Sequence, residues 1–281
     1  MDIKPLSQGF GAEVTGFDIH HGGALADVAA LRAAYLQWNL LIFRGCELLA
    51  PERQVEITGW FGTIGANSDE QGRPWTVLHN DNAIGSAVLP FHCDISYMQY
   101  PLEGISLHPL ALPGIETSTT FVSNAVAWDA LPREVQNELR GLRGRHYYAS
   151  SAQMNMDWPT FEHWHPVCLD HPKTKRPLLF VTEHHVDRIS DVGDARSAEL
   201  LELLFSELYA PRRRYEHVWR VGDLVIWDNL AIQHARTRAS APSDGVRALQ
   251  RVAIGEHGFL EQLELVRRSR ADAREPSRSF Q

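Results

Sequence analysis

The stretch GDLVIWDNLAIQHAR, residues 222–236, joins a short apolar run to a histidine. The run at 224–227 is continuous and lies between Asp223 and Asp228. A short apolar run bounded by turn-forming residues is typical of a β-strand. The stretch therefore predicts a strong strand followed closely by His234, whose imidazole could serve a site at the strand's end.

Several other short runs also have the pattern of strands, and fewer have the pattern of helices. Strands are predicted at 10–19, 40–43, 178–182, 215–219 and 248–254. Apolar side chains that recur every three or four residues predict helices at 25–38 and about 195–208, and Pro51 opens a helix that ends around Phe61. Many short strands with few helices favour a mainly β protein with flanking helices, either a β-sandwich or a jelly roll.

Two irregular stretches interrupt these elements. Residues 62–90 show little periodicity and much turn chemistry, and residues 147–164 are rich in aromatic side chains and methionine. Dense aromatic side chains are costly to leave in water, so we interpret the second stretch as lining a pocket. The last fifteen residues hold five arginines and few apolar residues. We therefore predict a single domain at 1–266 and a flexible tail at 267–281.

The overall composition is that of a folded, acidic protein. The chain has 281 residues, 44% of them hydrophobic, and a formal net charge of −8. This charge gives no general attraction to nucleic acid or to an anionic membrane. No apolar stretch approaches the roughly 20 residues that span a bilayer. The three cysteines form no CxxC pair and the N-terminus shows no secretory pattern, so we expect reduced thiols and a cytoplasmic location.

The chemistry-bearing pattern is a His-x-Asp pair. Iron(II) that must also bind a chelating cosubstrate and oxygen needs its protein ligands on one face, which two imidazoles and one carboxylate can supply. Residues two apart on a strand project to the same side, so His-x-Asp offers two of these ligands together. A third ligand must then come from a distant strand.

Spacing separates one His-x-Asp pair from the others. With 14 histidines and 35 acidic residues, about two His-x-acid matches are expected by chance. The sequence contains His79/Asp81, His92/Asp94 and His185/Asp187. Of these pairs, the one at 92 and 94 is followed by a histidine just after a strong strand, 234 − 94 = 140 residues later. The predicted metal ligands are therefore His92, Asp94 and His234.

Two arginines follow the last of these histidines. Arg247 and Arg251 lie 13 and 17 residues beyond His234, on another predicted strand. A guanidinium matches a carboxylate with two parallel hydrogen bonds. Arg247 is therefore the candidate that holds the distal carboxylate of 2-oxoglutarate, whose oxo acid end chelates iron.

Six segments together resemble the taurine dioxygenase and chlorophenoxyacetate dioxygenase (TauD/TfdA) family of Fe(II)/2-oxoglutarate enzymes. They are GAEVTGFDI, FHCDISYMQYP, TTFVSNAVAWDALP, HPVCLDHPKTKRPLLFV, GDLVIWDNLAIQHA and RALQRVAIGE, and they span about 10–255. Their order and spacing make the resemblance specific. It implies a double-stranded β-helix, the cupin-like jelly roll, in an enzyme that can form a homo-oligomer.

The resemblance also implies residue roles. His92, Asp94 and His234 would ligate iron, and Arg247 would bind the cosubstrate together with Thr119. Thr117 is a rival for Thr119, because GIETST stands where the family has a shorter segment. Arg251 matches the arginine that meets the substrate's anionic group. We expect Tyr147 and Trp158 to cover the substrate's apolar body.

The implied reaction is a coupled oxidation. Oxygen and 2-oxoglutarate are consumed, succinate and CO2 are released, and a small organic acid is hydroxylated, with C–O, C–N or C–S cleavage where the hydroxyl lands beside a heteroatom. Asp94 favours hydroxylation over halogenation, since halogenating relatives lack this carboxylate. The alternatives are a halogenase or desaturase variant, and a jelly-roll metalloprotein that is not an oxygenase.

Overall fold

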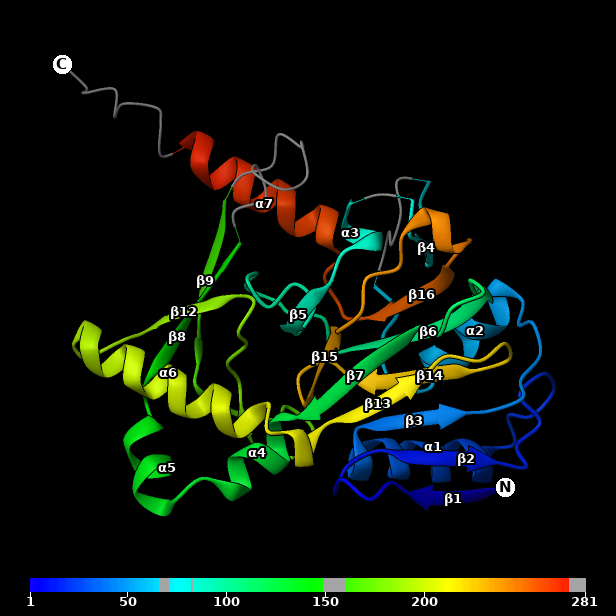
Figure 1. Cartoon of the computed structure of the whole chain (residues 1–281), viewed down its shortest axis with the longest axis horizontal. Coiled ribbons are helices and arrows are strands. Elements are labelled where there is room, and N and C mark those ends of the chain that lie inside the picture. The colour runs from blue at the N-terminus through cyan, green and yellow to red at the C-terminus, as the bar shows by residue number, and fades with distance from the viewer. Residues whose placement is uncertain (66–70, 82, 149–159, 273–281) are drawn as a thin grey trace.

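The computed structural model describes residues 1–65, 71–81, 83–148 and 160–272. Two main sheets pack against each other, with helices around them (Figure 1). In the described residues the larger sheet has the order β1-β2-β3-β14-β6-β16-β4 and the smaller has the order β13-β7-β15-β5. The bounds are β1 Asp2–Pro5, β2 Ala12–Thr15, β3 Leu40–Phe43, β14 Leu224–Asp228, β6 Gly104–Ala111, β16 Ala248–Ile254, β4 Thr76–His79, β13 Tyr215–Val218, β7 Ser118–Ser123, β15 Ile232–Arg236 and β5 Leu89–His92.

The main core lies between these two sheets. Phe121 and Ile232 from the smaller sheet belong to the same buried cluster as Ile105, Val225 and Trp227 from the larger one. Apolar side chains of both sheets thus leave water together, which is the main stabilising contribution in such a two-layer fold. The prediction of a mainly β jelly roll with flanking helices is confirmed.

Strand β14 explains why the sequence at 224–227 is continuously apolar. Leu224 and Ile226 pack with the helices on the outer face of the larger sheet, whereas Val225 and Trp227 pack into the core between the sheets. Successive side chains of a strand point to opposite faces, so a strand covered on both faces carries no polar alternation. β3 beside it has the same pattern and ends where predicted.

Two helices cover the outer face of the larger sheet. α1 (Leu25–Trp38) and α2 (Pro51–Gly59) bury Leu31 and Ile57 in the cluster that receives the outward side chains of β14. Asn39 caps the C-terminal end of α1. Its φ of 61° is left-handed, and its backbone N–H donates to the carbonyl of Tyr35. An asparagine tolerates this C-terminal conformation better than most residues.

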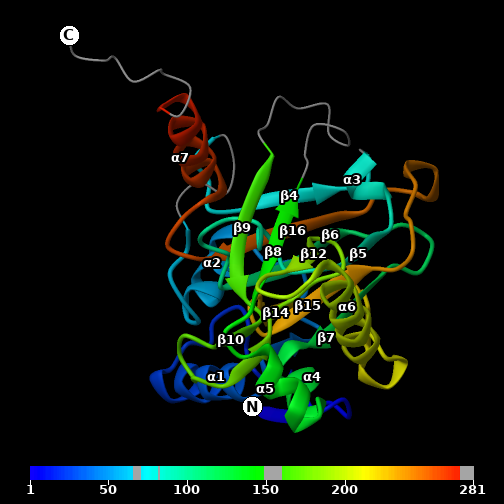
Figure 2. The same cartoon turned by 90° about the vertical axis from the view of Figure 1, so that its left-hand side faces the viewer.

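A third layer stands beside the jelly roll and faces the viewer in Figure 2. It contains a sheet of order β12-β8-β9, a β10-β11 hairpin and several helices. α6 packs its leucine face onto this layer, as the periodicity predicted. The bounds of this layer's elements, and of the elements not yet given, are β8 Arg143–Tyr148, β9 Phe161–Pro166, β10 Cys168–Asp170, β11 Pro177–Leu179, β12 Val186–Ile189, α3 Ala83–Ser86, α4 Asn124–Ala130, α5 Arg133–Leu139, α6 Asp194–Leu208, α7 Phe259–Asp272, and short 3-10 turns at Pro211–Arg213 and Pro242–Asp244.

Several predicted boundaries differ from the structure. Residues 62–90 are not irregular throughout, because they contain β4, α3 and the start of β5, and β1 carries no predicted strand. β1 and β4 are the edge strands of their sheet and their side chains are exposed or half-buried. An edge strand held by backbone pairing needs no apolar alternation, so the sequence pattern is weak. α7 runs through Asp272, past the predicted domain end at 266.

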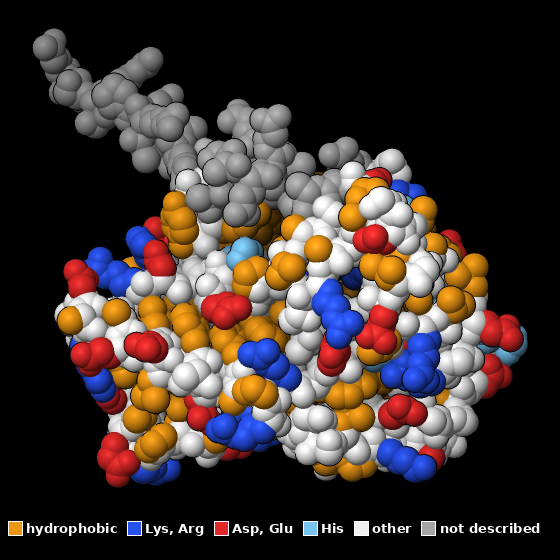
Figure 3. All heavy atoms as spheres, in the orientation of Figure 1, with side chains coloured by type: hydrophobic (Ala, Val, Ile, Leu, Met, Phe, Trp, Pro, Cys, Tyr) orange, Lys and Arg blue, Asp and Glu red, His pale blue; other side chains and the backbone are white. Residues whose placement is uncertain are grey.

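None of the helices within the described ranges is both long and apolar enough to cross a bilayer. On the face drawn in Figure 3, acidic and basic side chains are interspersed rather than gathered by sign.

Buried histidines make the third layer sensitive to acid. His146 on β8 and His165 on β9 meet edge to face with ring centroids 5.0 Å apart, and the His146 ring stacks on Phe180 at 5.1 Å. Burial lowers the pKa of His146 well below its ordinary value, and burial together with His163 lowers the pKa of His165 to about 4. Both imidazoles are therefore neutral in the folded protein near neutral pH.

We expect the free energy of unfolding to fall as the pH drops from about 6.5 towards 4. In that pH range these histidines bind protons in the unfolded chain but not in the folded chain. The free energy of unfolding therefore falls by about 1.4 kcal/mol per pH unit for each such histidine. His146→Phe, which keeps the stacked ring, should flatten the dependence of Tm on pH. The exposed His20→Gln is the control. An unchanged pH slope in His146→Phe would contradict the assignment.

Candidate metal centre

Strand pairing brings the two predicted histidine ligands together. His92 is the last residue of β5, and it pairs with His234 of β15 in antiparallel register. Directly opposed residues on one face of an antiparallel pair have Cβ atoms about 5 Å apart. The two imidazole centroids are 4.3 Å apart. A link between positions 142 residues apart in sequence thus follows from one strand pairing.

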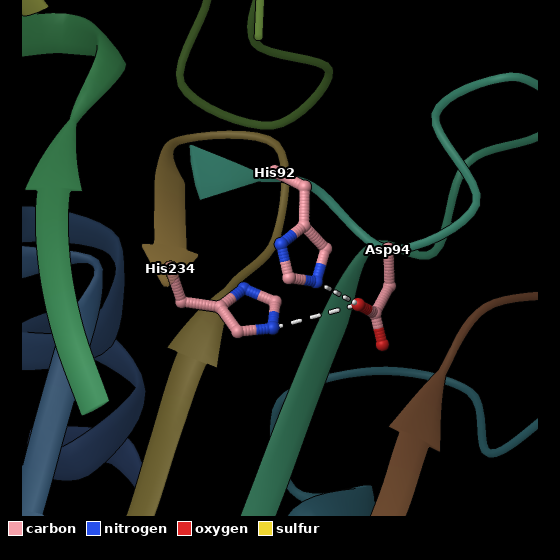
Figure 4. A group of neighbouring side chains, drawn as sticks. All are labelled: His92, Asp94 and His234. Carbon is pink, nitrogen blue, oxygen red and sulfur yellow. Dashed lines mark ion pairs between the residues drawn. The ribbon is translucent and has the colours of Figure 1, made fainter. Parts of the chain in front are cut away.

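Asp94 completes the group from the segment that follows β5. Its Oδ1 lies 3.3 Å from Nε2 of His92 and 3.5 Å from Nε2 of His234 (Figure 4). The ligand atoms of all three lie within 4.8 Å of one another, and this is the one such group of three or more found in the described part of the chain. The other two His-x-Asp pairs, His79/Asp81 and His185/Asp187, belong to no such group among the described residues.

Hydrogen bonds and charge hold these side chains in the form that binds a metal. Nδ1 of His92 lies 2.8 Å from the carbonyl oxygen of Pro90, which turns Nε2 towards Asp94. Burial alone would raise the pKa of Asp94, but Arg251 and the two imidazoles outweigh it and hold the pKa well below its usual value. Burial and the neighbouring His92 lower the pKa of His234 to about 3. An ionised carboxylate and a neutral imidazole are the states that ligate.

Arg251 lies in direct contact with this group. Its Nη2 donates to Oδ2 of Asp94 over 2.7 Å. The oxygen of Asp94 that faces the histidines is Oδ1, so the arginine occupies the opposite oxygen. Arg251, which we predicted to bind the substrate's anionic group, is therefore separated from the predicted metal position by the carboxylate of Asp94.

Arg247 is buried with unpaired nitrogens. Only 4% of its surface is exposed, and neither Nε nor Nη1 has a hydrogen-bond partner among the described residues. Burial and the nearby charge of Arg236 lower its pKa to about 10. Leaving a buried guanidinium without an anion is costly. The donors present at Arg247 thus fit a carboxylate ligand.

Thr119 has a hydroxyl that is already oriented. It is buried on β7, and its Oγ1 accepts a hydrogen bond of 3.0 Å from Nε1 of Trp219. Accepting from the indole leaves the hydroxyl hydrogen available as a donor. Thr119 shares its strand face with Phe121, which is paired with His234. The rival Thr117 lies before β7 and is tied to Trp219 through its backbone carbonyl.

Aromatic side chains form a wall beside His92, and sequence reasoning identified only part of this region. The rings of His184 and His185 lie 5.8 and 6.1 Å from the His92 ring. Tyr148 stacks on Tyr97, whose ring meets His185 at 5.0 Å. These contacts leave a ring-lined surface next to the candidate metal ligands.

Tyr148, rather than the predicted Tyr147, joins this wall. Alternate side chains of a strand point to opposite faces, and the Tyr147 ring lies under the guanidinium of Arg145 at 5.5 Å. The contacts of Tyr147 thus give no support to its predicted role beside the substrate. The predicted Trp158 lies outside the described residues.

A jelly roll that presents two imidazoles and a carboxylate to one point, with a buried unpaired guanidinium nearby, defines the class of mononuclear non-haem metal oxygenases. The chain belongs to the taurine catabolism dioxygenase TauD, TfdA family, whose model matches residues 2–253. It is accordingly a 2-oxoglutarate-dependent dioxygenase, and the family implies a metal, 2-oxoglutarate and O2. The expected alternative of a metalloprotein that is not an oxygenase does not fit this membership.

Individual relatives agree with this assignment. The chain is 29% identical to an (S)-phenoxypropionate/alpha-ketoglutarate dioxygenase of Sphingobium herbicidovorans, over 84% of this chain and 89% of the relative. It is also 29% identical to the alpha-ketoglutarate-dependent 2,4-dichlorophenoxyacetate dioxygenase of Cupriavidus pinatubonensis, with 84% and 91% covered. A taurine dioxygenase structure from Burkholderia xenovorans superposes with a TM-score of 0.78 at 25% identity, over 91% of this chain and 90% of that one.

We expect His234→Ala or Asp94→Ala to weaken binding of Mn(II) or Co(II) by more than about 100-fold, since loss of even a supporting partner costs about 10–100-fold. Calorimetric titration under anaerobic conditions measures the affinity without turnover. The double variant His79→Ala/Asp81→Ala is the matched control, because it removes a His-x-Asp motif that does not belong to the group of three found in the described residues. Equal losses in both sets would contradict the proposed ligand set.

Proposed function

We propose that the enzyme uses Fe(II) to hydroxylate a small organic acid with an apolar or aromatic body. The overall reaction converts substrate C–H, 2-oxoglutarate and O2 into substrate C–OH, succinate and CO2, so that each oxygen atom and electron pair is accounted for. A hydroxyl placed beside an ether, amine or thioether atom leads to cleavage of the C–O, C–N or C–S bond.

His92, Asp94 and His234 would hold the iron. Two imidazoles and one carboxylate leave several coordination positions free, which is the pattern of non-haem Fe(II) oxygenases. The bound iron supplies the activation of O2. The chain's own contribution is to keep the His234 imidazole neutral, the Asp94 carboxylate ionised and the three side chains close to one point.

Arg247 would bind the distal carboxylate of 2-oxoglutarate, and this buried, unpaired guanidinium is the observation that carries the proposal. It directly precedes β16, the strand that bears Arg251. A carboxylate would accept two parallel hydrogen bonds from one edge of the guanidinium, on which Nη2 lies beside either Nε or Nη1. Thr119, whose hydroxyl hydrogen is free to donate, would serve another lone pair of the same cosubstrate.

The substrate would lie between Arg251 and the aromatic wall. Arg251 offers a cation beside Asp94, and Tyr97, Tyr148 and His184 offer ring faces on the side of His92. The relatives named above act on phenoxypropionate and dichlorophenoxyacetate, according to their names. Both molecules join an anionic group to an aromatic ring, which supports a substrate of this type. The presence of Asp94 supports hydroxylation rather than halogenation.

The Arg247 assignment is tested by binding of 2-oxoglutarate. We expect Arg247→Met to weaken the affinity by about 30-fold or more, because truncating one partner of a buried charge pair costs about 2–5 kcal/mol. Calorimetry with Mn(II) present measures this affinity without turnover. Arg238→Met is the control, since Arg238 is exposed and pairs with Glu116. An unchanged affinity in Arg247→Met would overturn the proposed cosubstrate site.

The Arg251 assignment is tested by charge selectivity. We expect Arg251→Gln to lower kcat/KM for aryloxy acids by at least about 10-fold more than for the corresponding neutral amides, because an anion loses a charge-assisted bond. Succinate release over a substrate panel gives both values. The ratio matters because Arg251 also touches Asp94, and damage to the metal ligands would lower both activities together. A parallel loss would refute the role in anion recognition.

A further inference from the structure

Asn229 encloses the backbone of Asp94. Its side-chain Oδ1 accepts from the N–H of Asp94 over 2.9 Å, and its Nδ2 donates to the Asp94 carbonyl over 3.1 Å. Nδ2 also donates to the carbonyl of Leu102 over 2.9 Å. The residue is fully buried. One amide thus satisfies both backbone polar groups of a proposed metal ligand.

Asp94 needs such support because no strand fixes it. β5 ends at His92, and the segment that follows has turns rather than a ladder. The next residue, Ile95, has a φ of 49°, a left-handed conformation that is strained for a β-branched side chain. Strain of this kind persists only where the surroundings hold the backbone in place. At Asp94, the side-chain amide of Asn229 supplies hydrogen bonds that hold the backbone in place.

Asn229 is itself held on both sides. Its backbone N–H donates to the carbonyl of Glu103 over 2.9 Å. The preceding Asp228 accepts from the N–H groups of Leu230 and Ala231 at 3.0 Å, and its other oxygen lies 2.8 Å from Nε2 of the buried His171. The turn that carries Asn229 leads directly into β15 and His234. One turn therefore governs the segments that carry two of the proposed ligands.

Asn80 makes a related arrangement around Arg247, in which its side chain and its backbone each supply one bond. Its Oδ1 accepts from the N–H of Arg247 over 2.9 Å, and its own N–H donates to the Arg247 carbonyl over 3.2 Å. Its Nδ2 donates to the carbonyls of Gly245 and Ala241 over 2.9 and 3.2 Å. Asn80 is buried, and Arg247 lies just before β16 begins. Here too an asparagine fixes a residue that the strand does not.

We propose that Asn229 and Asn80 are positioning residues with separate tasks. Asn229 sets the metal affinity by holding Asp94, and Asn80 sets the 2-oxoglutarate affinity by holding Arg247. The inference rests on the proposed function for the roles of Asp94 and Arg247. Neither asparagine touches metal or cosubstrate, so each acts through the residue it encloses.

Gln262 on α7 provides a matched control, because it encloses the backbone of Tyr100, six residues after Asp94. Its Oε1 accepts from the N–H of Tyr100 over 3.1 Å, and its Nε2 donates to the Tyr100 carbonyl over 2.9 Å. It is as buried as Asn80. Gln262→Ala therefore removes side-chain bonds to the N–H and carbonyl of one residue, as Asn229→Ala does, but that residue is not a proposed ligand.

The experiment compares Asn229→Ala, Asn80→Ala and Gln262→Ala by two calorimetric titrations, Mn(II) alone and then 2-oxoglutarate at saturating Mn(II). Loss of a residue that orients a ligand costs about 10–100-fold in metal affinity. We expect that loss in Asn229→Ala only. Asn80→Ala should bind Mn(II) as the wild type does and lose about 10-fold in 2-oxoglutarate affinity, the effect of one lost charge-assisted contact. Gln262→Ala should keep both affinities.

The outcomes separate this inference from the proposed function. If the wild-type protein binds Mn(II) but not 2-oxoglutarate, both the proposed function and the proposed role of Asn80 are overturned. The role of Asn229 is then still tested by the Mn(II) affinities alone. Wild-type affinities in both asparagine variants, or equal losses in all three variants, overturn the inference. If Asn229→Ala does not fold, Asn229→Asp replaces it: it keeps the acceptor, loses both donated bonds, and should still bind Mn(II) more weakly.

Discussion

The antiparallel register between β5 and β15 is the constraint on which the site depends. It sets His92 opposite His234, so two imidazoles from distant parts of the chain share one face of the smaller sheet. A shift of one residue would turn one of these side chains to the other face of its strand. Packing on both faces of β15 and β7 fixes that register, because a shift would also move Ile232 and Phe121 out of the core between the two sheets.

Regular pairing stops at the edge of the site, and single side chains take over from it. His92 and His234 are placed by the strand pairing, whereas Asp94 lies two residues beyond β5 and Arg247 one residue before β16. Each of these two outlying residues has its backbone held by a buried asparagine. Strands give direction to a side chain, but the exact reach of the carboxylate and guanidinium depends on these amide contacts. The site is thus built from two sheets and completed by loops.

A feature of the fold or the site was predictable from the sequence only where its physical cause imposes a pattern on the residues. β3, β14 and α1 were predictable because burial on one or both faces imposes apolar patterns. The grouping of the three ligand candidates was predictable from spacing and family resemblance, and the structure brings them together. The edge strand β4 has no apolar alternation that would predict it from the sequence. The choice between Tyr147 and Tyr148 depends on which face of β8 each side chain points to, which the sequence does not show. Asn80 and Asn229 act through backbone bonds, which a sequence alone does not reveal.

An acidic protein that uses an anionic cosubstrate must concentrate positive charge in a few places. The chain carries a net charge of −8, yet it buries Arg247 without an anion among its described neighbours and places Arg236 close enough to lower that pKa further. Desolvated cations of this kind oppose folding and favour a bound carboxylate. Arg251 differs, because Asp94 already neutralises it. A dianion that fills the Arg247 position therefore relieves a cost already present in the folded chain, and this gives cosubstrate binding a driving force that Arg251 alone could not supply.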